Sequence, residues 1–164
     1  MNEWVLVSHW LVVGILATIF MDLFALGQKK LLGIASLNYC LVGRWLLYMP
    51  GGQFRHHTIL QTQPRSGECA LGWVSHYVIG VLFAALFYLL AGMQPGQASF
   101  AAVVLFGVAT VVVPFFVMQP GLGFGVMAAK TPAPATARMR SVVAHASYGL
   151  GLFLALRLVS FVTL

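Results

Sequence analysis

Charged residues are what this sequence has least of. Its 164 residues include three Asp or Glu, and charged residues make up 7% of the chain. A soluble domain carries about a quarter charged residues, because its surface must face water. With 60% apolar residues, this chain cannot cover a globular surface with polar groups, so lipid must solvate much of it. The composition predicts an all-α membrane protein with one integral membrane domain over residues 1–164.

The shortage of acids also limits the chemistry that the chain can supply. No Ser–His–acid or Cys–His signature is present, so hydrolytic or paired-carboxylate catalysis is poorly supported and we do not favour an enzyme. The nine Lys and Arg residues form no basic face on a soluble fold, which argues against a nucleic-acid partner.

Cysteine is sparse as well. Cys40 and Cys69 are the two cysteines, too few for a disulfide framework. Both lie in a segment that the charge distribution places in the cytoplasm, so we expect reduced thiols. A metal site assembled from these cysteines with His56 and His57 would match no zinc spacing.

Long apolar runs are abundant. Four are long enough to cross roughly 30 Å of hydrocarbon. The sequence therefore predicts a four-transmembrane-helix bundle with spans at about 4–26, 70–91, 100–117 and 142–164.

The basic residues predict the orientation of these spans. Eight of the nine Lys and Arg residues fall between spans one and two or between spans three and four, and the turn at 92–99 has none. The positive-inside rule assigns both basic connections to the cytoplasm. Both termini then lie on the other side of the membrane.

The connection between the first two spans, 27–69, is not an ordinary polar loop. Leu41, Trp45 and Tyr48 surround Arg44, a mixture typical of an interfacial amphipathic or re-entrant segment. The turn residues at 49–52 should end it. For the other cytoplasmic connection, 119–140, we expect an irregular loop.

The two halves of the chain resemble each other weakly. Ala17-Thr18 in span one matches Ala109-Thr110 in span three, and a histidine followed four residues later by glycine occurs in spans two and four. Each half would be two spans entered from the same side, a parallel repeat. Met49-Pro50-Gly51 likewise matches Met118-Gln119-Pro120-Gly121. Against the repeat, the Met-Gln-Pro-Gly motif occurs again at 93–96, where the repeat has no place for it.

Asp22 is the acid inside span one. Gly14, Thr18 and Asp22 are spaced four residues apart, so they share one helix face. We favour a packing role for this face, with Asp22 near the interface and paired with a cytoplasmic arginine. The alternative is a proton or cation site.

His76 and His145 each precede a glycine by four residues on one helix face. The favoured interpretation is a hydrogen bond from each imidazole to a facing carbonyl or hydroxyl. The alternatives are ligation of haem or a metal ion, and a proton-handling or quinone-type polar site.

Two further features lie near the predicted cytoplasmic face. Glu68 stands just before span two, where a helix N-terminus favours an acid, and its predicted partner is Arg44, Arg55 or Arg138. The alternating glycines at 121, 123 and 125 either cradle an anion such as a lipid phosphate or, as we favour, form a closely packed loop.

Several of these motifs together resemble a known family. They are Met21-Asp22-Leu23, Leu41-Val42-Gly43-Arg44-Trp45, Met49-Pro50-Gly51-Gly52-Gln53-Phe54, Gly67-Glu68, His76-Tyr77, Pro114-Phe115-Phe116, Met118-Gln119-Pro120 and Ala137-Arg138, with His145 and Gly149. The chain resembles the bacterial membrane family known as domain-of-unknown-function family 2938 over nearly its whole length. Two positions depart from the expected pattern, Cys40 in place of a small residue and Lys130 in place of Ser or Arg. The resemblance implies a four-span protein of the bacterial inner membrane and implies no activity. In such a membrane, the orientation predicted from the basic residues makes both termini periplasmic.

The sequence is compatible with three alternative functions. The first is binding or transport of a small ligand or ion in a cytoplasm-facing polar pocket, and the second is an accessory subunit whose polar residues only lock helices together. The third is a redox bundle in which His76 and His145 hold haem or metal; no cofactor is specified by the sequence. Expected partners are the bilayer, anionic lipid and a second copy of the chain. The predicted pocket comprises Asp22, Asn38, Arg44, Glu68, His76, Gln119, Arg138 and His145.

Overall fold

The structure is a computed structural model that describes residues 3–91 and 97–162. Six α-helices are described: α1 (Glu3–Leu32), α2 (Tyr39–Tyr48), α3 (Glu68–Ala91), α4 (Phe100–Ala109), α5 (Gln119–Gly121) and α6 (Pro134–Val162). Short 3-10 turns occur at Met49–Gly51, Ile59–Gln61 and Val126–Ala128, and a π-helical turn at Pro114–Met118. No strand occurs in these described ranges, so the all-α prediction is confirmed.

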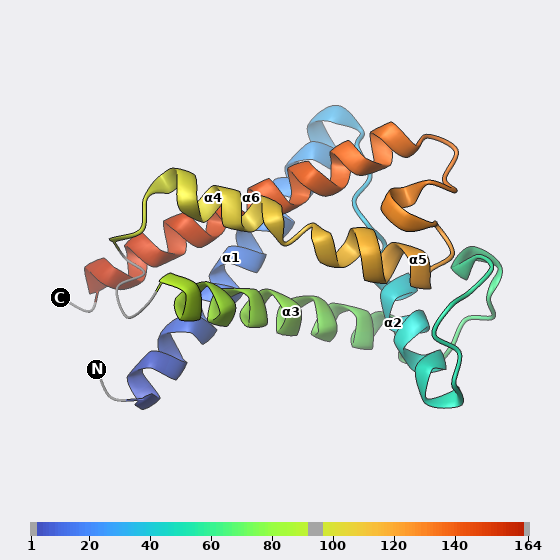
Figure 1. Cartoon of the computed structure of the whole chain (residues 1–164), viewed down its shortest axis with the longest axis horizontal. Coiled ribbons are helices and arrows are strands. Elements are labelled where there is room, and N and C mark those ends of the chain that lie inside the picture. Colours follow the sequence, from blue (N-terminus) through green and yellow to red (C-terminus); the bar gives the residue numbers. More distant parts are fainter. Residues whose placement is uncertain (1–2, 92–96, 163–164) are drawn as a thin grey trace. The chain divides into compact units, whose positions relative to one another are not determined.

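The chain forms two compact units, and each is described by itself (Figure 1). The first unit comprises residues 1–36, 77–110 and 143–164. The second comprises residues 37–76 and 111–142. Helices α3 and α6 each contribute their N-terminal part to the second unit and the remainder to the first.

Four helical segments in the described residues are long and apolar enough to cross a membrane: Ser8–Leu32, Glu68–Ala91, Phe100–Gly121 and Pro134–Phe161. The prediction of four spans is therefore confirmed, and two of the helices extend past the span ends predicted for them. Helix α1 continues to Leu32, six residues beyond the predicted end, until Gly33 takes a positive φ of 68°. Helix α6 begins at Pro134, because proline is well suited to the first helical position and no breaker follows it.

The third span is interrupted. Helix α4 ends at Ala109, and a π-helical turn follows from Pro114 to Met118. Proline has no N–H to donate and its ring crowds the preceding turn, so regular α-helix cannot pass through Pro114 unchanged. Within the predicted irregular loop at 119–140, only residues 122–133 lie between α5 and α6.

The fully buried apolar residues in the core of the first unit are small or branched, and aromatic residues such as Tyr148 pack with them. Val13, Ala17, Ala84, Val103 and Leu152 are fully buried there. By contrast, many large apolar side chains point outward, among them Leu89 with 80% of its surface exposed. So much exposed apolar surface would be unfavourable in water, and soluble proteins rarely have it. These side chains are therefore suited to contact lipid.

Small residues set the distance between helices in the first unit. Gly80 of α3 lies against Thr18 of α1, and Gly149 of α6 lies against Gly107 of α4. A Cβ atom at Gly80 would overlap the Thr18 hydroxyl, and one at Gly107 would overlap the backbone of Gly149, so the close packing requires glycine at these two positions. The packing role proposed for Thr18 is confirmed, and the similar contacts in the two halves agree with the parallel repeat, which stays a prediction.

Candidate functional site

Helix α2 is a defined element in the first cytoplasmic connection that the sequence predicts. The Asn38 side chain accepts a hydrogen bond of 3.0 Å from the backbone N–H of Cys40 and so caps the start of α2. The helix ends at Tyr48, and Gly52 follows with a positive φ of 80°. The predicted end at residues 49–52 is therefore confirmed. Asn38, predicted to line a polar pocket, serves as this cap.

Two glycines bring α2 into backbone contact with the start of α3. A Cβ atom at Gly43 would overlap the carbonyl oxygen of Glu68, and one at Gly72 would overlap the carbonyl oxygen of Tyr39. No side chain larger than hydrogen fits at either position. The second unit is therefore organised around a contact in which the two backbones touch.

This contact joins the two cysteines. Cys40 and Cys69 form a disulfide, with their Cα atoms 3.9 Å apart. The prediction of reduced thiols is wrong for this structure. The reason is geometric: each cysteine is the second residue of its helix, and the glycine contact places these two helix starts side by side.

The Arg44 guanidinium is enclosed by acceptors in the second unit. Its Nε and Nη2 atoms donate to the two carboxylate oxygens of Glu68 at 2.8 and 2.7 Å, and Nη1 donates to the carbonyl oxygens of Thr62 and Ile59 at 2.8 and 3.2 Å. The side chains of Arg44 and Glu68 are 10% and 12% exposed. Hydrogen bonding to the carboxylate raises the pKa of Arg44. Arg44, one of the three predicted partners of Glu68, forms the ion pair with it.

His56 is buried in the second unit. From the sequence it was a candidate only for a zinc site whose spacing did not fit. Its Nδ1 lies 3.0 Å from the Thr62 hydroxyl and 3.2 Å from the Gln53 amide nitrogen. Its Nε2 is buried and makes no hydrogen bond among the described residues. Burial lowers the pKa of His56, because the charged imidazolium would be desolvated there. Sequence alone carries no signal for this burial.

Stability of the second unit should depend on pH through His56. Below its ordinary pKa of 6.5, the unfolded chain binds a proton that folded His56 resists. The free energy of unfolding should therefore fall as the pH is lowered from 7 to 5. We expect His56→Gln to flatten this dependence in thermal unfolding of the detergent-solubilised protein, and His57→Gln, at the exposed neighbour, to leave it unchanged. An unchanged profile in His56→Gln would contradict the assignment.

The glycine run at 121–125 is a closely packed loop, as favoured above. Gly121 lies against the indole of Trp45, and Gly123 lies against the backbone of residues 56–57. The N–H of His56 donates to the carbonyl oxygen of Gly121 at 2.9 Å. These contacts pack the glycine run against Trp45 and the backbone of residues 56–57.

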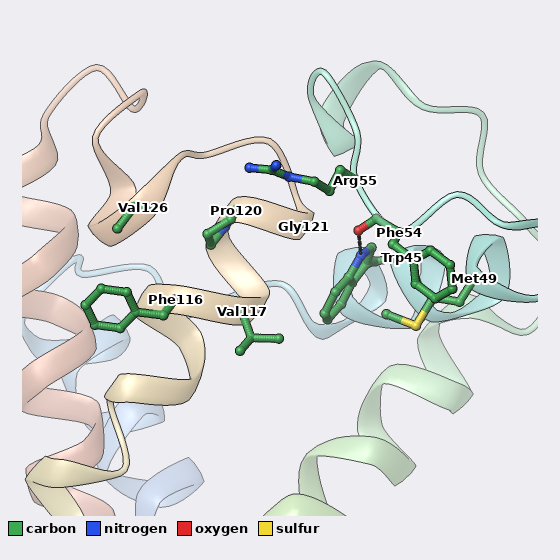
Figure 2. Close-up of a pocket in the computed structure, with 9 residues that line it drawn as sticks. All are labelled: Trp45, Met49, Phe54, Arg55, Phe116, Val117, Pro120, Gly121 and Val126. Atoms are coloured by element: carbon green, nitrogen blue, oxygen red, sulfur yellow. Dashed lines mark hydrogen bonds between the residues drawn. The ribbon is translucent and has the colours of Figure 1, made fainter.

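Beside this loop is a hollow of about 460 Å³ in the second unit (Figure 2). It is lined by Trp45, Met49, Phe54, Arg55, Phe116, Val117, Pro120, Gly121 and Val126. The indole N–H of Trp45 donates to the carbonyl oxygen of Phe54 at 2.8 Å, which holds the ring in its wall. Phe54 and Phe116 are 60% and 55% exposed, so the walls present apolar surface outward.

Arg55 is the charged residue among those that line this hollow. Figure 2 shows its side chain extending from the loop toward the side on which Pro120 lies. The second unit contains six Lys and Arg residues and one acid, Glu68, whose two oxygens are taken by Arg44. The hollow therefore combines apolar walls with one cation, in a unit whose basic residues outnumber its acids.

The other predicted pocket residues have local partners. In the second unit, Gln119 donates to the Ser141 hydroxyl at 3.2 Å, and the Arg138 Nε donates to the carbonyl oxygen of Met127 at 2.8 Å. The His76 ring stacks on Tyr39 with centroids 4.1 Å apart. The carboxamide oxygen of Gln119 is buried without a partner among the described residues.

Asp22 and His145 belong to the first unit. The Tyr77 hydroxyl donates to Asp22 at 3.0 Å. The pairing of Asp22 with a cytoplasmic arginine stays a prediction. The His145 Nδ1 lies 2.6 Å from the Thr110 hydroxyl, which confirms the hydrogen-bond interpretation for this histidine. That all eight residues surround one pocket stays a prediction. The described ranges contain no group of three or more His, Cys, Asp or Glu residues that could hold a metal ion.

Comparison with known proteins identifies the family of this chain. The family model described as "Protein of unknown function (DUF2938)" matches residues 11–159. The chain belongs to this family. The resemblance drawn from the sequence motifs is thereby confirmed. No curated protein and no solved structure matches the chain.

Proposed function

We propose that this DUF2938 protein binds an anionic membrane amphiphile in the hollow of its second unit. The observation that carries the proposal is the combination of apolar walls with Arg55. An acyl chain would lie along the walls and a phosphate or carboxylate headgroup would pair with the guanidinium.

The dimensions of the hollow support a small amphiphile. Its volume of about 460 Å³ falls in the range of ordinary ligand sites, roughly 300–1,000 Å³. Such sites are mostly apolar with a few polar groups that orient the ligand. Trp45 supplies a large flat wall, and its fixed indole reduces the entropy lost on binding.

A membrane lipid is the natural occupant because the chain has four helices suited to lipid. Unpaired basic residues near a membrane surface attract anionic headgroups, by about 1 kcal/mol for each residue. We also propose that the second unit lies on the cytoplasmic side of a bacterial inner membrane, where the positive-inside rule places Arg55 and its basic neighbours.

Three polar residues of the predicted pocket support a positioning role. Arg44 and Glu68 hold α2 to α3, while Asn38 caps α2. In this proposal they hold in place helix α2, which forms part of the wall of the hollow, and they do not contact the ligand. They lock helices together, as the accessory-subunit hypothesis expected, and this role is compatible with a ligand in the hollow.

Removing the Arg55 charge should weaken selective binding. We expect Arg55→Gln to lower affinity for phosphatidylglycerol roughly fivefold, corresponding to about 1 kcal/mol, with little effect on phosphatidylcholine. Binding of each lipid to the purified full chain is measured by native mass spectrometry in mild detergent. The matched control is Arg140→Gln, which removes an exposed charge of the same unit that does not line the hollow.

Two results would overturn the proposal. One is equal affinity of the wild-type protein for the two lipids. The other is an equal loss in the Arg55 and Arg140 variants, which would indicate general attraction of a basic surface.

A further inference from the structure

The disulfide between Cys40 and Cys69 occupies an unusual place in the fold. Each cysteine is the second residue of an α-helix, of 10 residues in α2 and 24 in α3. The N-terminal turns of both helices therefore meet at the two sulfur atoms. We propose that this pair is a reversible thiol–disulfide exchange site, which is independent of lipid binding.

The helix starts favour the reduced form. Free N–H groups and the helix dipole place partial positive charge at a helix N-terminus, and this charge stabilises a thiolate. Two helices contribute here, in a unit with six basic residues and one acid. A disulfide whose thiolates are stabilised is more readily reduced, because its sulfur atoms are better leaving groups.

The sulfur atoms differ in access. Cys69 is exposed and Cys40 is half-buried. An incoming thiolate would therefore attack the Cys69 sulfur and release Cys40 as the thiolate in the first turn of α2. No large movement of the second unit is needed for this step.

The exchange is balanced with a small thiol such as glutathione as the co-reactant. Its thiolate bonds to the Cys69 sulfur while the Cys40–Cys69 bond breaks, and the Cys40 thiolate takes up a proton. A second glutathione thiolate then displaces Cys69. In total, two glutathione molecules lose two electrons and two protons, which reduce the disulfide to two thiols and leave glutathione disulfide.

The contact between α2 and α3 does not depend on the disulfide alone. The close approach at Gly43 and Gly72 and the bonds between Arg44 and Glu68 also hold the two helix starts together. After reduction, the two thiols should remain close enough to pair again. This persistence is what an exchange site requires.

The experiment is a redox titration of the full chain in isolated membranes. Samples are equilibrated in buffers of varied glutathione to glutathione disulfide ratio, quenched with acid and alkylated with a maleimide that shifts gel mobility. We expect a reversible transition between the oxidised pair and two free thiols within the ratios that glutathione buffers can reach. Cys40→Ser and Cys69→Ser serve as single-thiol markers.

A second measurement tests the role of the helix start. In Cys40→Ser, the remaining Cys69 should react with iodoacetamide at pH 7 roughly fivefold faster than the same variant in denaturant. A pair that stays oxidised in excess glutathione until the protein is denatured would overturn the proposal. So would a pair that stays reduced in excess glutathione disulfide, or a Cys69 thiol that reacts no faster in the folded protein.

Discussion

Replacing Gly43 with alanine should disrupt the second unit. The added Cβ would overlap the carbonyl oxygen of Glu68, which belongs to helix backbone and cannot rotate away. Helix α2 would have to move off α3, separating Cys40 from Cys69 and weakening the bonds of Arg44. We expect a loss of about 3 kcal/mol in the free energy of unfolding, at the upper end for overpacking. Thermal unfolding in detergent measures this loss.

The matched control for this substitution is Gly51→Ala. Gly51 is exposed in the same unit, has no atom within 4 Å of an added Cβ and shows no positive φ. Its replacement should change stability by less than about 0.5 kcal/mol. Formation of the Cys40–Cys69 bond, followed by alkylation and gel shift, gives an independent measure of the contact. Equal stability and equal disulfide formation in the two variants would contradict the glycine contact.

Removing the Glu68 charge should have the second largest effect. In Glu68→Gln the Arg44 guanidinium stays nearly buried but loses its carboxylate partner, while its bonds to backbone carbonyl groups remain. Unpairing a buried ion pair costs roughly 3–5 kcal/mol, and exposed pairs contribute up to about 1 kcal/mol. For a pair about one-tenth exposed, held also by backbone acceptors, we expect a loss of about 2 kcal/mol.

Unfolding of three variants separates this pair from general charge effects. Arg140→Met removes an exposed basic residue and should cost less than about 0.5 kcal/mol. Replacing Arg44 with methionine and Glu68 with leucine together should recover part of the loss, because no charge is then left buried. A Glu68→Gln protein as stable as Arg140→Met would show that the ion pair contributes little.

The proposed lipid site and the disulfide share helix α2. Trp45 forms a wall of the hollow, and Cys40 fixes the start of the same helix. The two proposals remain separable by experiment. Lipid affinity is expected to respond to Arg55, whereas the redox transition is expected to respond to the cysteines.

Locally encoded features were predictable from the sequence. Low charge and long apolar runs determined the membrane class and the four spans, because lipid selects such segments whatever their neighbours are. The turn residues at 49–52 determined where α2 ends. The interruption of the third span at Pro114 was also encoded locally, and its π-helical turn could have been anticipated from the proline.

Contacts between distant segments were decided only by the tertiary structure. Three predicted partners for Glu68 could not be ranked, and the cysteines were expected to be free. His56 showed no pattern of burial, and the hollow has walls from residues 45–55 and 116–126. Composition and periodicity indicate which side chains lie on the same face of one helix. They do not indicate which helices come into backbone contact. The meeting of α2 and α3 depends on the glycines at 43 and 72, where the absence of a side chain lets the two helices touch. This contact brings Arg44 to Glu68 and Cys40 to Cys69.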